Sequence, residues 1–321
     1  MSFADTLWSN FLSILQIFIL GCAGFYVLKR GILGACCLRT VSNLVLEVTM
    51  PCFMFTNIVA NFPLVRGEGW YLFPVYAVAM ILLGAALAAG YVKLDRGIRE
   101  RGEFASLVAF NNGGFMPIVI IGSLLPAEAA GKVYVYIFLF TLIYPAVMFS
   151  LSGRIFSGRG GGRPGWKDVL NSATLSTLLA VAVSMAGLGK YVPEFLFRPL
   201  KLIGDATIPL SMIVVGGILM VNFSPKALER AGFVLKAAAL KLLALPAVTY
   251  AVLLLVDLPR DVEFLLILES LMPPAVTLPL LAGKHDGDYV LVGQALSGIT
   301  ILSFLTVPPA LALFHLFPTA G

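Results

Sequence analysis

The sequence predicts an all-α integral membrane protein with ten transmembrane helices, arranged as two inverted five-helix repeats. Three observations predict this class. Hydrophobic residues make up 59% of the 321 residues and charged residues only 12%, which is far more apolar than an ordinary soluble domain. Apolar stretches of membrane-spanning length recur along the chain. Proline-containing motifs of the first half also return, in the same order, in the second half.

The apolar stretches define the ten expected helices. A helix rises about 1.5 Å per residue, so ~20 apolar residues cross the ~30 Å of hydrocarbon in a bilayer. The expected helices cover residues 8–28, 40–60, 70–91, 106–125, 133–152, 170–188, 199–221, 235–256, 262–282 and 289–316. The segment before the first helix contains Asp5 and no lysine or arginine, unlike a cleaved signal peptide, so we expect this helix to remain in the protein.

Basic residues between these helices predict the orientation. Most of the 22 Lys and Arg residues follow the first, third and fifth helices or border the seventh and eighth. Positively charged loops stay in the cytoplasm, so we expect a multi-pass protein of the cell (inner or plasma) membrane with both termini extracytoplasmic. This anchoring accounts for the net charge of +5. Membrane lipid is therefore an expected partner and nucleic acid is not.

A glycine- and arginine-rich stretch divides the chain into two halves. Residues 153–169 include Gly158-Arg-Gly-Gly-Gly-Arg-Pro-Gly165 and predict a flexible cytoplasmic linker. The first five-helix repeat is expected at 1–152 and the second at 170–321. Because five is an odd number, the second repeat must enter the membrane from the opposite side, which makes the two repeats inverted.

One pair of matching motifs lies in the second and seventh expected helices. Glu47-x-Thr-x-Pro51 returns as Asp205-x-Thr-x-Pro209. Each acid precedes its proline by one helical turn. We interpret these residues as structural kink pairs, and a direct role in binding a coupling ion is the alternative.

The fourth expected helix contains Phe110-Asn-Asn-Gly-Gly-Phe-Met-Pro117 near the middle of the membrane. Proline lacks an N–H and clashes with the carbonyl one turn earlier, and the glycines add backbone freedom, so this helix is predicted to be broken. Backbone groups freed at a break need polar partners within the protein. A simple kink, with Asn111 and Asn112 bonded to neighbouring helices, is the structural alternative.

The ninth expected helix contains the matching interruption, Glu269-Ser-Leu-Met-Pro-Pro-Ala-Val-Thr-Leu-Pro279. Paired broken helices indicate a transporter binding site near the middle of the membrane, where the N-termini of two half-helices aim partial positive charge at one point and suit an anion. The candidate binding residues are Asn111, Asn112, Gly113, Gly114, Pro117, Pro273, Pro274, Ala275 and Thr277.

Three further polar residues are candidates for handling a coupling ion or a proton. Glu269 lies one turn before the break in the ninth helix, where a proton on it can follow substrate occupancy; structural pairing or capping is the alternative. Lys241, near the start of the eighth helix, can snorkel to the cytoplasm or pair with a carboxylate or an anionic substrate. Gln294 shares a face of the tenth helix with Ser297 and Thr300, and this face can line a cavity or join helices.

These motifs carry a resemblance to a known family. Met50-Pro-Cys-Phe-Met-Phe55, the Phe110–Pro117 motif, Leu271-Met-Pro-Pro-Ala275 and Leu305-Thr-Val-Pro308 resemble the auxin efflux carrier family, which includes bacterial malate and malonate permeases and plant PIN-type exporters. The resemblance covers nearly the whole chain. It implies the bile-acid-transporter (NhaA-like) type of fold, with broken helices 4 and 9 that cross. It also implies a scaffold of helices 1, 2, 6 and 7, a transport domain of helices 3–5 and 8–10 and a homodimer through the scaffold.

In the PIN-type members, asparagines at both crossing points help to bind the substrate carboxylate. The resemblance assigns this role to Asn111 or Asn112 in helix 4. Helix 9 departs from the pattern, because it offers Pro274, Ala275 and Thr277 in place of an asparagine. The long hydrophilic loop of the large plant members is also absent.

The sequence therefore predicts a secondary active transporter of a small organic anion, a mono- or dicarboxylate that includes auxin-like compounds, moved by elevator-type alternating access. A sodium-coupled bile-acid-type symporter or an ion-coupled antiporter of the same fold is the alternative. No cofactor is expected beyond a coupling H⁺ or Na⁺. The four cysteines lack metal-ligand spacing, and the chain contains no His-Glu-x-x-His, Gly-x-Ser-x-Gly or TVGYG motif. A metal site, an enzyme and a channel are therefore not expected.

Overall fold

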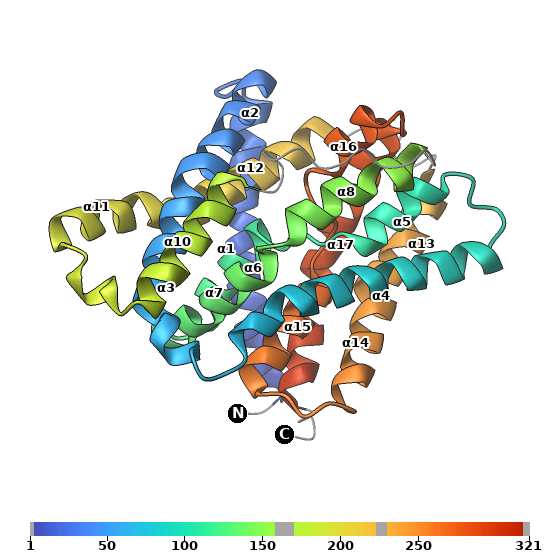
Figure 1. Cartoon of the computed structure of the whole chain (residues 1–321). Helices are drawn as coiled ribbons and strands as arrows, with labels where there is room; N and C mark the ends of the chain where they lie inside the picture. Colours follow the sequence, from blue (N-terminus) through green and yellow to red (C-terminus); the bar gives the residue numbers. More distant parts are fainter. Residues whose placement is uncertain (1–2, 158–169, 223–229, 317–321) are drawn as a thin grey trace.

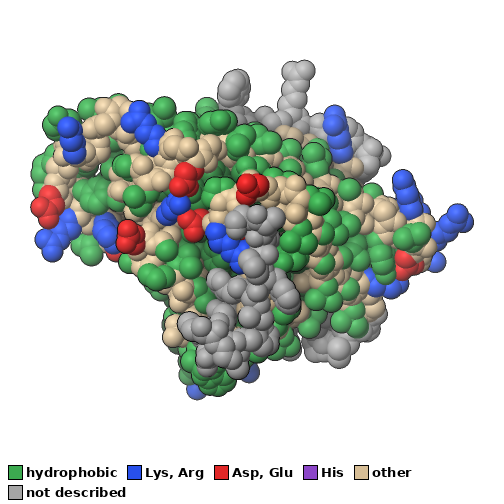
Figure 2. Space-filling view, turned by 90° about the horizontal axis from the view of Figure 1, so that it is seen from below, with side chains coloured by type: hydrophobic (Ala, Val, Ile, Leu, Met, Phe, Trp, Pro, Cys, Tyr) green, Lys and Arg blue, Asp and Glu red, His purple; other side chains and the backbone are tan. Residues whose placement is uncertain are grey.

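The computed structural model describes residues 3–157, 170–222 and 230–316, and their regular secondary structure is helical (Figure 1). An isolated β-bridge joins Asn111 and Pro274. Large apolar side chains stand on the outer faces of the helices; Leu82 is 59% exposed and Leu305 68%. In the view from below, hydrophobic side chains spread over much of the surface and charged ones gather in small groups (Figure 2). These outer faces suit lipid, as expected for a multi-pass membrane protein.

Seven described helices are long and apolar enough to cross a bilayer. They cover Phe11–Lys29, Cys36–Val65, Trp70–Leu94, Ala127–Phe156, Glu194–Asn222, Ala231–Leu253 and Tyr289–Phe314. The expected fourth, sixth and ninth helices do not reach this length as single helices. The fourth and ninth are each divided in two, and the sixth is the short helix α10, Ser172–Met185. Its 14 residues extend about 21 Å at the usual rise per residue.

The described residues of the first half contribute ten helical elements. They are α1 Phe3–Lys29, α2 Ala35–Leu44, the π-helix η1 Val45–Thr49, α3 Met50–Val65, the 3-10 turn η2 Trp70–Leu72, α4 Phe73–Leu94, α5 Arg101–Ala109, α6 Phe115–Leu124, α7 Ala127–Thr141 and α8 Tyr144–Ser157. Helix α8 therefore includes residues 153–157 of the expected linker. It is held there by close packing, because a Cβ placed on Gly102 of α5 would lie only 2.0 Å from the carbonyl oxygen of Ile155. The rest of the expected linker, 158–169, lies outside the described residues.

The second half contributes α10, the 3-10 helix η3 Leu188–Tyr191, α11 Glu194–Asp205, α12 Thr207–Asn222, α13 Ala231–Ala239, the π-helix η5 Leu240–Ala244, α14 Leu245–Leu253, α15 Arg260–Leu271, α16 Leu278–Lys284 and α17 Tyr289–Leu316. The two halves are interleaved: α1 packs along α12 and α17, and α10 packs along α3. In Figure 1 the start of α1 and the end of α17 lie at the same end of the molecule.

Each of the two π-helices precedes a proline and holds one ionisable residue. Pro51 follows η1, which contains Glu47, and Pro246 follows η5, which contains Lys241. A proline ring collides with the carbonyl one turn before it, and a widened turn relieves that collision. The same widening changes which way the charged side chain of that turn points.

Ion pairs tie the connections between helices. On the loop between α4 and α5, Asp95 accepts from Lys236 at 2.6 Å and Glu100 pairs with Arg230 at 2.8 Å. The hydrogen bond from Lys236 holds the pKa of Asp95 below its ordinary value. At the start of α7, Lys132 binds Glu68 at 3.0 Å and Asp261 at 2.7 Å. These contacts join the α4–α5 loop to α13, and the starts of α7 and α15 to each other and to Glu68.

Candidate functional site

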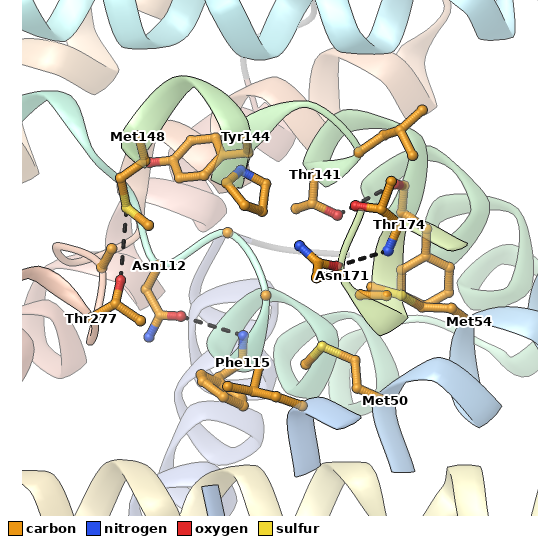
Figure 3. Close-up of a pocket in the computed structure, with 18 of the residues that line it drawn as sticks. Met50, Met54, Asn112, Phe115, Thr141, Tyr144, Met148, Asn171, Thr174 and Thr277 are labelled. Carbon is orange, nitrogen blue, oxygen red and sulfur yellow. Dashed lines mark hydrogen bonds between the residues drawn. The ribbon is translucent and has the colours of Figure 1, made fainter. Parts of the chain in front are cut away.

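Three helix interruptions meet around one cavity of about 350 Å³ (Figure 3). Residues 110–114 separate α5 from α6, residues 272–277 separate α15 from α16, and residues 142–143 separate α7 from α8. The remaining wall comes from η1, α3 and the start of α10. The cavity therefore lies between elements of the expected scaffold and elements of the expected transport domain.

Backbone hydrogen bonds hold two of the interruptions together. The Asn112 N–H donates to the Pro273 carbonyl at 2.8 Å, and the Ala275 N–H donates to the Phe110 carbonyl at 3.0 Å. The two bonds are reciprocal. In each interruption one residue donates its N–H to the other segment, and the residue two positions earlier accepts through its carbonyl. The half-helices α6 and α16 both begin on the third residue after these donors, at Phe115 and Leu278. The two crossing segments thus share one local geometry.

The prolines after each interruption lie in the first turn of a half-helix. Pro117 is the third residue of α6, and Pro279 lies near the start of α16. The first N–H groups of a helix have no intrahelical acceptor, so a proline there loses no hydrogen bond. The carbonyl with which Pro117 would clash in a continuous helix belongs to Gly113, outside the helix. This is why the chain breaks before Pro117 rather than kinking at it.

Asn111 is only 1% exposed, and its backbone N–H and both side-chain polar atoms are hydrogen-bonded. Its backbone N–H donates to the hydroxyl of Tyr144, and its Nδ2 donates to the main-chain carbonyl of Glu269 at 2.8 Å. Its Oδ1 accepts a hydrogen bond from the Lys241 ammonium. Asn111 therefore fastens the crossing and links two buried charged residues.

Asn112 is also buried, at 4% exposure, but it differs from Asn111 in having a free donor. Its Oδ1 accepts from the Phe115 N–H at 3.3 Å, which caps α6. Its Nδ2 has no hydrogen-bond partner among the described residues, and the side chain lines the cavity (Figure 3). An unpaired buried amide donor beside a helix N-terminus can bind a negatively charged oxygen.

Lys241 is fully buried at the crossing, so the snorkelling that its sequence position allows does not occur. Its ammonium donates to the Val108 carbonyl at 3.0 Å and to Asn111. Lys241 belongs to the π-turn η5, and its ammonium reaches the end of α5 instead of the nearby end of its own helix. Glu269 is equally buried, and neither carboxylate oxygen has a hydrogen-bond partner among the described residues.

The rest of the cavity wall is mainly apolar. Methionine and aromatic side chains cover it, from Met50, Met54, Phe115, Phe138, Met148 and Phe149. Tyr144, Thr141, Thr174, Thr177 and Thr277 supply hydroxyl groups, and the N-cap residue Asn171 of α10 adds an amide. Glu47 is the one charged side chain among the described lining residues, and it lies at the exposed end of the cavity.

The structure brings most of the predicted binding residues together. Asn111, Asn112, Gly113, Gly114, Ala275 and Thr277 line the cavity; Pro273 and Pro274 form the crossing beside it, and Pro117 starts α6. Gln294 lies on α17 outside this lining. Lys241 and Glu269 stand behind the lining, at Asn111 and Gly113 respectively.

The expected kink pairs Glu47–Pro51 and Asp205–Pro209 lie at matching helix junctions but differ in their contacts. Pro51 starts α3 after η1, and Pro209 lies in the first turn of α12 after α11 ends. Glu47 accepts a hydrogen bond from the Ser172 hydroxyl and lines the cavity. Asp205 instead pairs with Lys201 at 2.8 Å, where both side chains are about half exposed.

Sequence reasoning missed several cavity residues. One is Tyr144, whose hydroxyl accepts from the Asn111 N–H. It precedes a proline within an apolar run, and this proline was the sequence signal that a third helix is interrupted. Thr174 and Asn171 belong to a helix whose approach to the crossing no local pattern indicates. The methionines of α3 are spaced by one turn, Met50 and Met54, and such spacing is as typical of an ordinary apolar core.

Comparison with known proteins agrees with this arrangement. The profile of a family described as "Membrane transport protein" matches residues 10–165 and, a second time, residues 163–309. An uncharacterized transporter of Methanocaldococcus jannaschii is 23% identical over 299 residues, covering 92% of this chain and 95% of the relative. An uncharacterized transporter of Methanothermobacter thermautotrophicus is 26% identical over 301 residues, with the same coverage.

The family match spans nearly the whole chain, in two consecutive segments of similar length. The first segment contains the interruptions at 110–114 and 142–143, and the second contains the one at 272–277. The chain belongs to the membrane transport protein family, the family of the auxin efflux carriers.

Proposed function

We propose that this membrane transport protein is a secondary active transporter of a small organic anion, which it binds in the cavity at the crossing of the two broken helices. The observation that carries the proposal is the free amide donor of Asn112, buried next to the N-terminus of α6 in a cavity of ligand size. The ammonium of Lys241 bonds to Asn111, the neighbour of Asn112, and its positive charge favours an anion over a cation.

The composition of the wall supports an anion with one carboxylate and an apolar body. Donors gather at the crossing, and no lysine or arginine is among the described residues that line the cavity. A second carboxylate on the substrate would have to approach Glu47 at the exposed end. Like charges repel, so a dicarboxylate is disfavoured relative to a monocarboxylate of the same length.

The position of the cavity supports alternating access of the elevator type. Its wall is shared between η1, α3 and α10, which belong to the proposed scaffold, and the three interruptions, which belong to the proposed transport domain. A substrate held at that boundary changes sides when one group of helices slides past the other. We further propose the ten-helix inverted repeat, a cell-membrane location with extracytoplasmic termini, and a homodimer through the scaffold. The outward apolar side chains of α11, such as Phe195 at 81% exposure, support the dimer.

The alternative is an ion-coupled symporter or antiporter of the same fold that uses Na⁺. The carboxylate of Glu269, which is buried without a hydrogen-bond partner among the described residues, favours this candidate. Sodium prefers such oxygen ligands, and a proton would satisfy the same carboxylate.

Reconstitution into proteoliposomes tests the proposal. Uptake of acetate, lactate, benzoate, phenylacetate, malonate and malate is measured under an imposed proton gradient, sodium gradient or neither. We expect uptake of at least one apolar monocarboxylate, and loss of it in Asn112→Asp, which replaces the donor with a second negative charge. Asn43→Asp, on the exposed face of α2, is the matched control. Failure of folded protein to bind or move any of the six anions would contradict the proposal.

A further inference from the structure

Two residues of opposite charge are buried at the crossing, and both come from the second half of the chain. Lys241 on η5 and Glu269 on α15 each have 0% exposure. Charged groups at membrane depth are costly unless they are compensated, and a compensated pair of this kind is a candidate for function. Their combined charge is zero when both are ionised.

The two charges differ in how well they are satisfied. The Lys241 ammonium has two acceptors, the Val108 carbonyl and Asn111 Oδ1. The Glu269 carboxylate has no hydrogen-bond partner among the described residues, although the main-chain carbonyl of Glu269 accepts from Asn111. The structure therefore fixes the positive charge in place and leaves the carboxylate as the group that can gain a proton.

Glu269 also lies directly behind the cavity wall. A Cβ placed on Gly113 would be 3.1 Å from its Oε2 and 3.6 Å from its Oε1. Among the described residues, the ionisable groups that interact with this carboxylate are Lys241 on η5 and the Tyr144 hydroxyl on α8. The acids Glu103 and Glu263 lie toward the other ends of α5 and α15, where Glu103 accepts from the Asp288 N–H and Glu263 pairs with Arg260.

An anion in this cavity upsets the charge balance. With Lys241 and Glu269 both ionised, a bound monoanion leaves one uncompensated negative charge in a poorly screened site. A proton on Glu269 restores the balance, since Lys241 then neutralises the substrate. Resting on the function proposed above, we propose that Glu269 takes up one proton when a monoanion binds in the cavity, so that the protein moves one proton with each anion.

The proton balance is simple. The proton comes from water on the side from which the anion enters, stays on the Glu269 carboxyl while the site changes sides, and returns to water when the anion leaves. No net charge then crosses the membrane, because the anion and the proton cancel. Lys241 keeps its position within the site and changes sides together with the bound anion.

Calorimetric titration with phenylacetate in lipid nanodiscs tests the inference. Titrations at neutral pH in buffers of different ionisation enthalpy give the number of protons taken up per bound anion. We expect close to one proton for the wild type and for the control Glu128→Gln, whose side chain is exposed on α7. We expect almost none for Glu269→Gln, which resembles the protonated carboxyl and should keep its affinity within about threefold.

Transport gives an independent readout. Phenylacetate uptake by wild-type proteoliposomes should follow the proton gradient and should not respond to a membrane potential set with potassium and valinomycin. In Glu269→Gln, exchange of labelled phenylacetate should persist, but a proton gradient should no longer drive its accumulation. Melting temperatures of all variants are compared to confirm that each is folded.

Three results would each overturn the inference while leaving the anion site intact. These are binding without proton uptake in the wild type, unchanged proton uptake in Glu269→Gln, and a sodium requirement for transport. Absence of binding for phenylacetate and every other anion of the panel would instead overturn the proposed function, and the inference with it.

Discussion

The two interrupted helices are alike in backbone and unlike in side chains. Reciprocal hydrogen bonds join them, and each half-helix begins at the same distance beyond the bond. The first break presents amides and glycines, Asn111 to Gly114, to the cavity. The second presents Ala275, Val276 and Thr277 to the cavity, with Pro273 and Pro274 beside it, and offers no amide side chain. The repeated backbone builds the crossing, and the divergence of its side chains places the amides, with the buried charges Lys241 and Glu269 behind them, at the first break.

Removal of the positive charge of Lys241 should have the largest effect on stability and anion uptake. Lys241→Met leaves the Val108 carbonyl and Asn111 Oδ1 without their donor, at about 1 to 3 kcal/mol for each buried acceptor. We expect a lower melting temperature and a loss of anion uptake of about 100-fold or more. Lys201→Met, in an exposed pair with Asp205, is the control and should change stability by less than about 1 kcal/mol.

A double variant sharpens this result. Adding Glu269→Gln to Lys241→Met removes the unbalanced negative charge, so the melting temperature should recover in part while anion uptake stays lost. Recovery of uptake would show that Lys241 is not the countercharge of the substrate.

The two glycines of the first break should respond differently to a methyl group. In Gly113→Ala the new Cβ meets the Glu269 carboxylate at 3.1 Å and Thr141 Cγ2 at 3.4 Å, so the carboxylate must shift. We expect binding to weaken about 5- to 10-fold, equivalent to ~1 kcal/mol. In Gly114→Ala the nearest atom is Met50 Cε at 3.8 Å, an ordinary contact, and binding should be unchanged. Calorimetric titrations measure both affinities. Equal weakening in the two variants would show that the position of the Glu269 carboxylate does not affect binding.

Glu47 should influence which anions bind rather than whether they bind. Because its carboxylate lies at the exposed end of the cavity, Glu47→Gln should raise affinity for malonate about 2- to 5-fold, a modest gain for a partly screened charge, and leave phenylacetate unaffected. Competition titrations with the two anions measure this ratio. A ratio that does not move would remove Glu47 from the selectivity of the site.

Asp205 should show the smallest effect, although its motif matches that of Glu47. Its contact is an exposed pair one turn away on the same helix, worth roughly 0.3 to 0.5 kcal/mol. Asp205→Asn should therefore leave anion binding intact and shift the melting temperature only slightly. Loss of binding in a folded variant would show that the two acids keep a common role.

Much of this arrangement could be predicted from the sequence because it depends on local chemistry. Prolines and glycines in long apolar runs allow few backbone conformations in a membrane, so the interruptions at Gly113 and Pro273 could be predicted. The direction of the Lys241 side chain was not, since it depends on a π-turn and on the approach of α5. Likewise, adjacent asparagines look equivalent in sequence. Only the three-dimensional contacts distinguish Asn111, whose side-chain nitrogen and oxygen are both bonded, from Asn112, whose Nδ2 has no partner among the described residues.

Affinity of the Asn112→Ala variant tests the central claim most directly. If the Asn112 amide donates to the substrate carboxylate, its removal costs a charge-assisted hydrogen bond of roughly 1.5 to 3 kcal/mol. Calorimetric titration of folded protein should then show binding of phenylacetate weakened about 10- to 100-fold, with Asn43→Ala at wild-type affinity. Wild-type affinity in Asn112→Ala would contradict the account, because it would place the anion away from the broken helix.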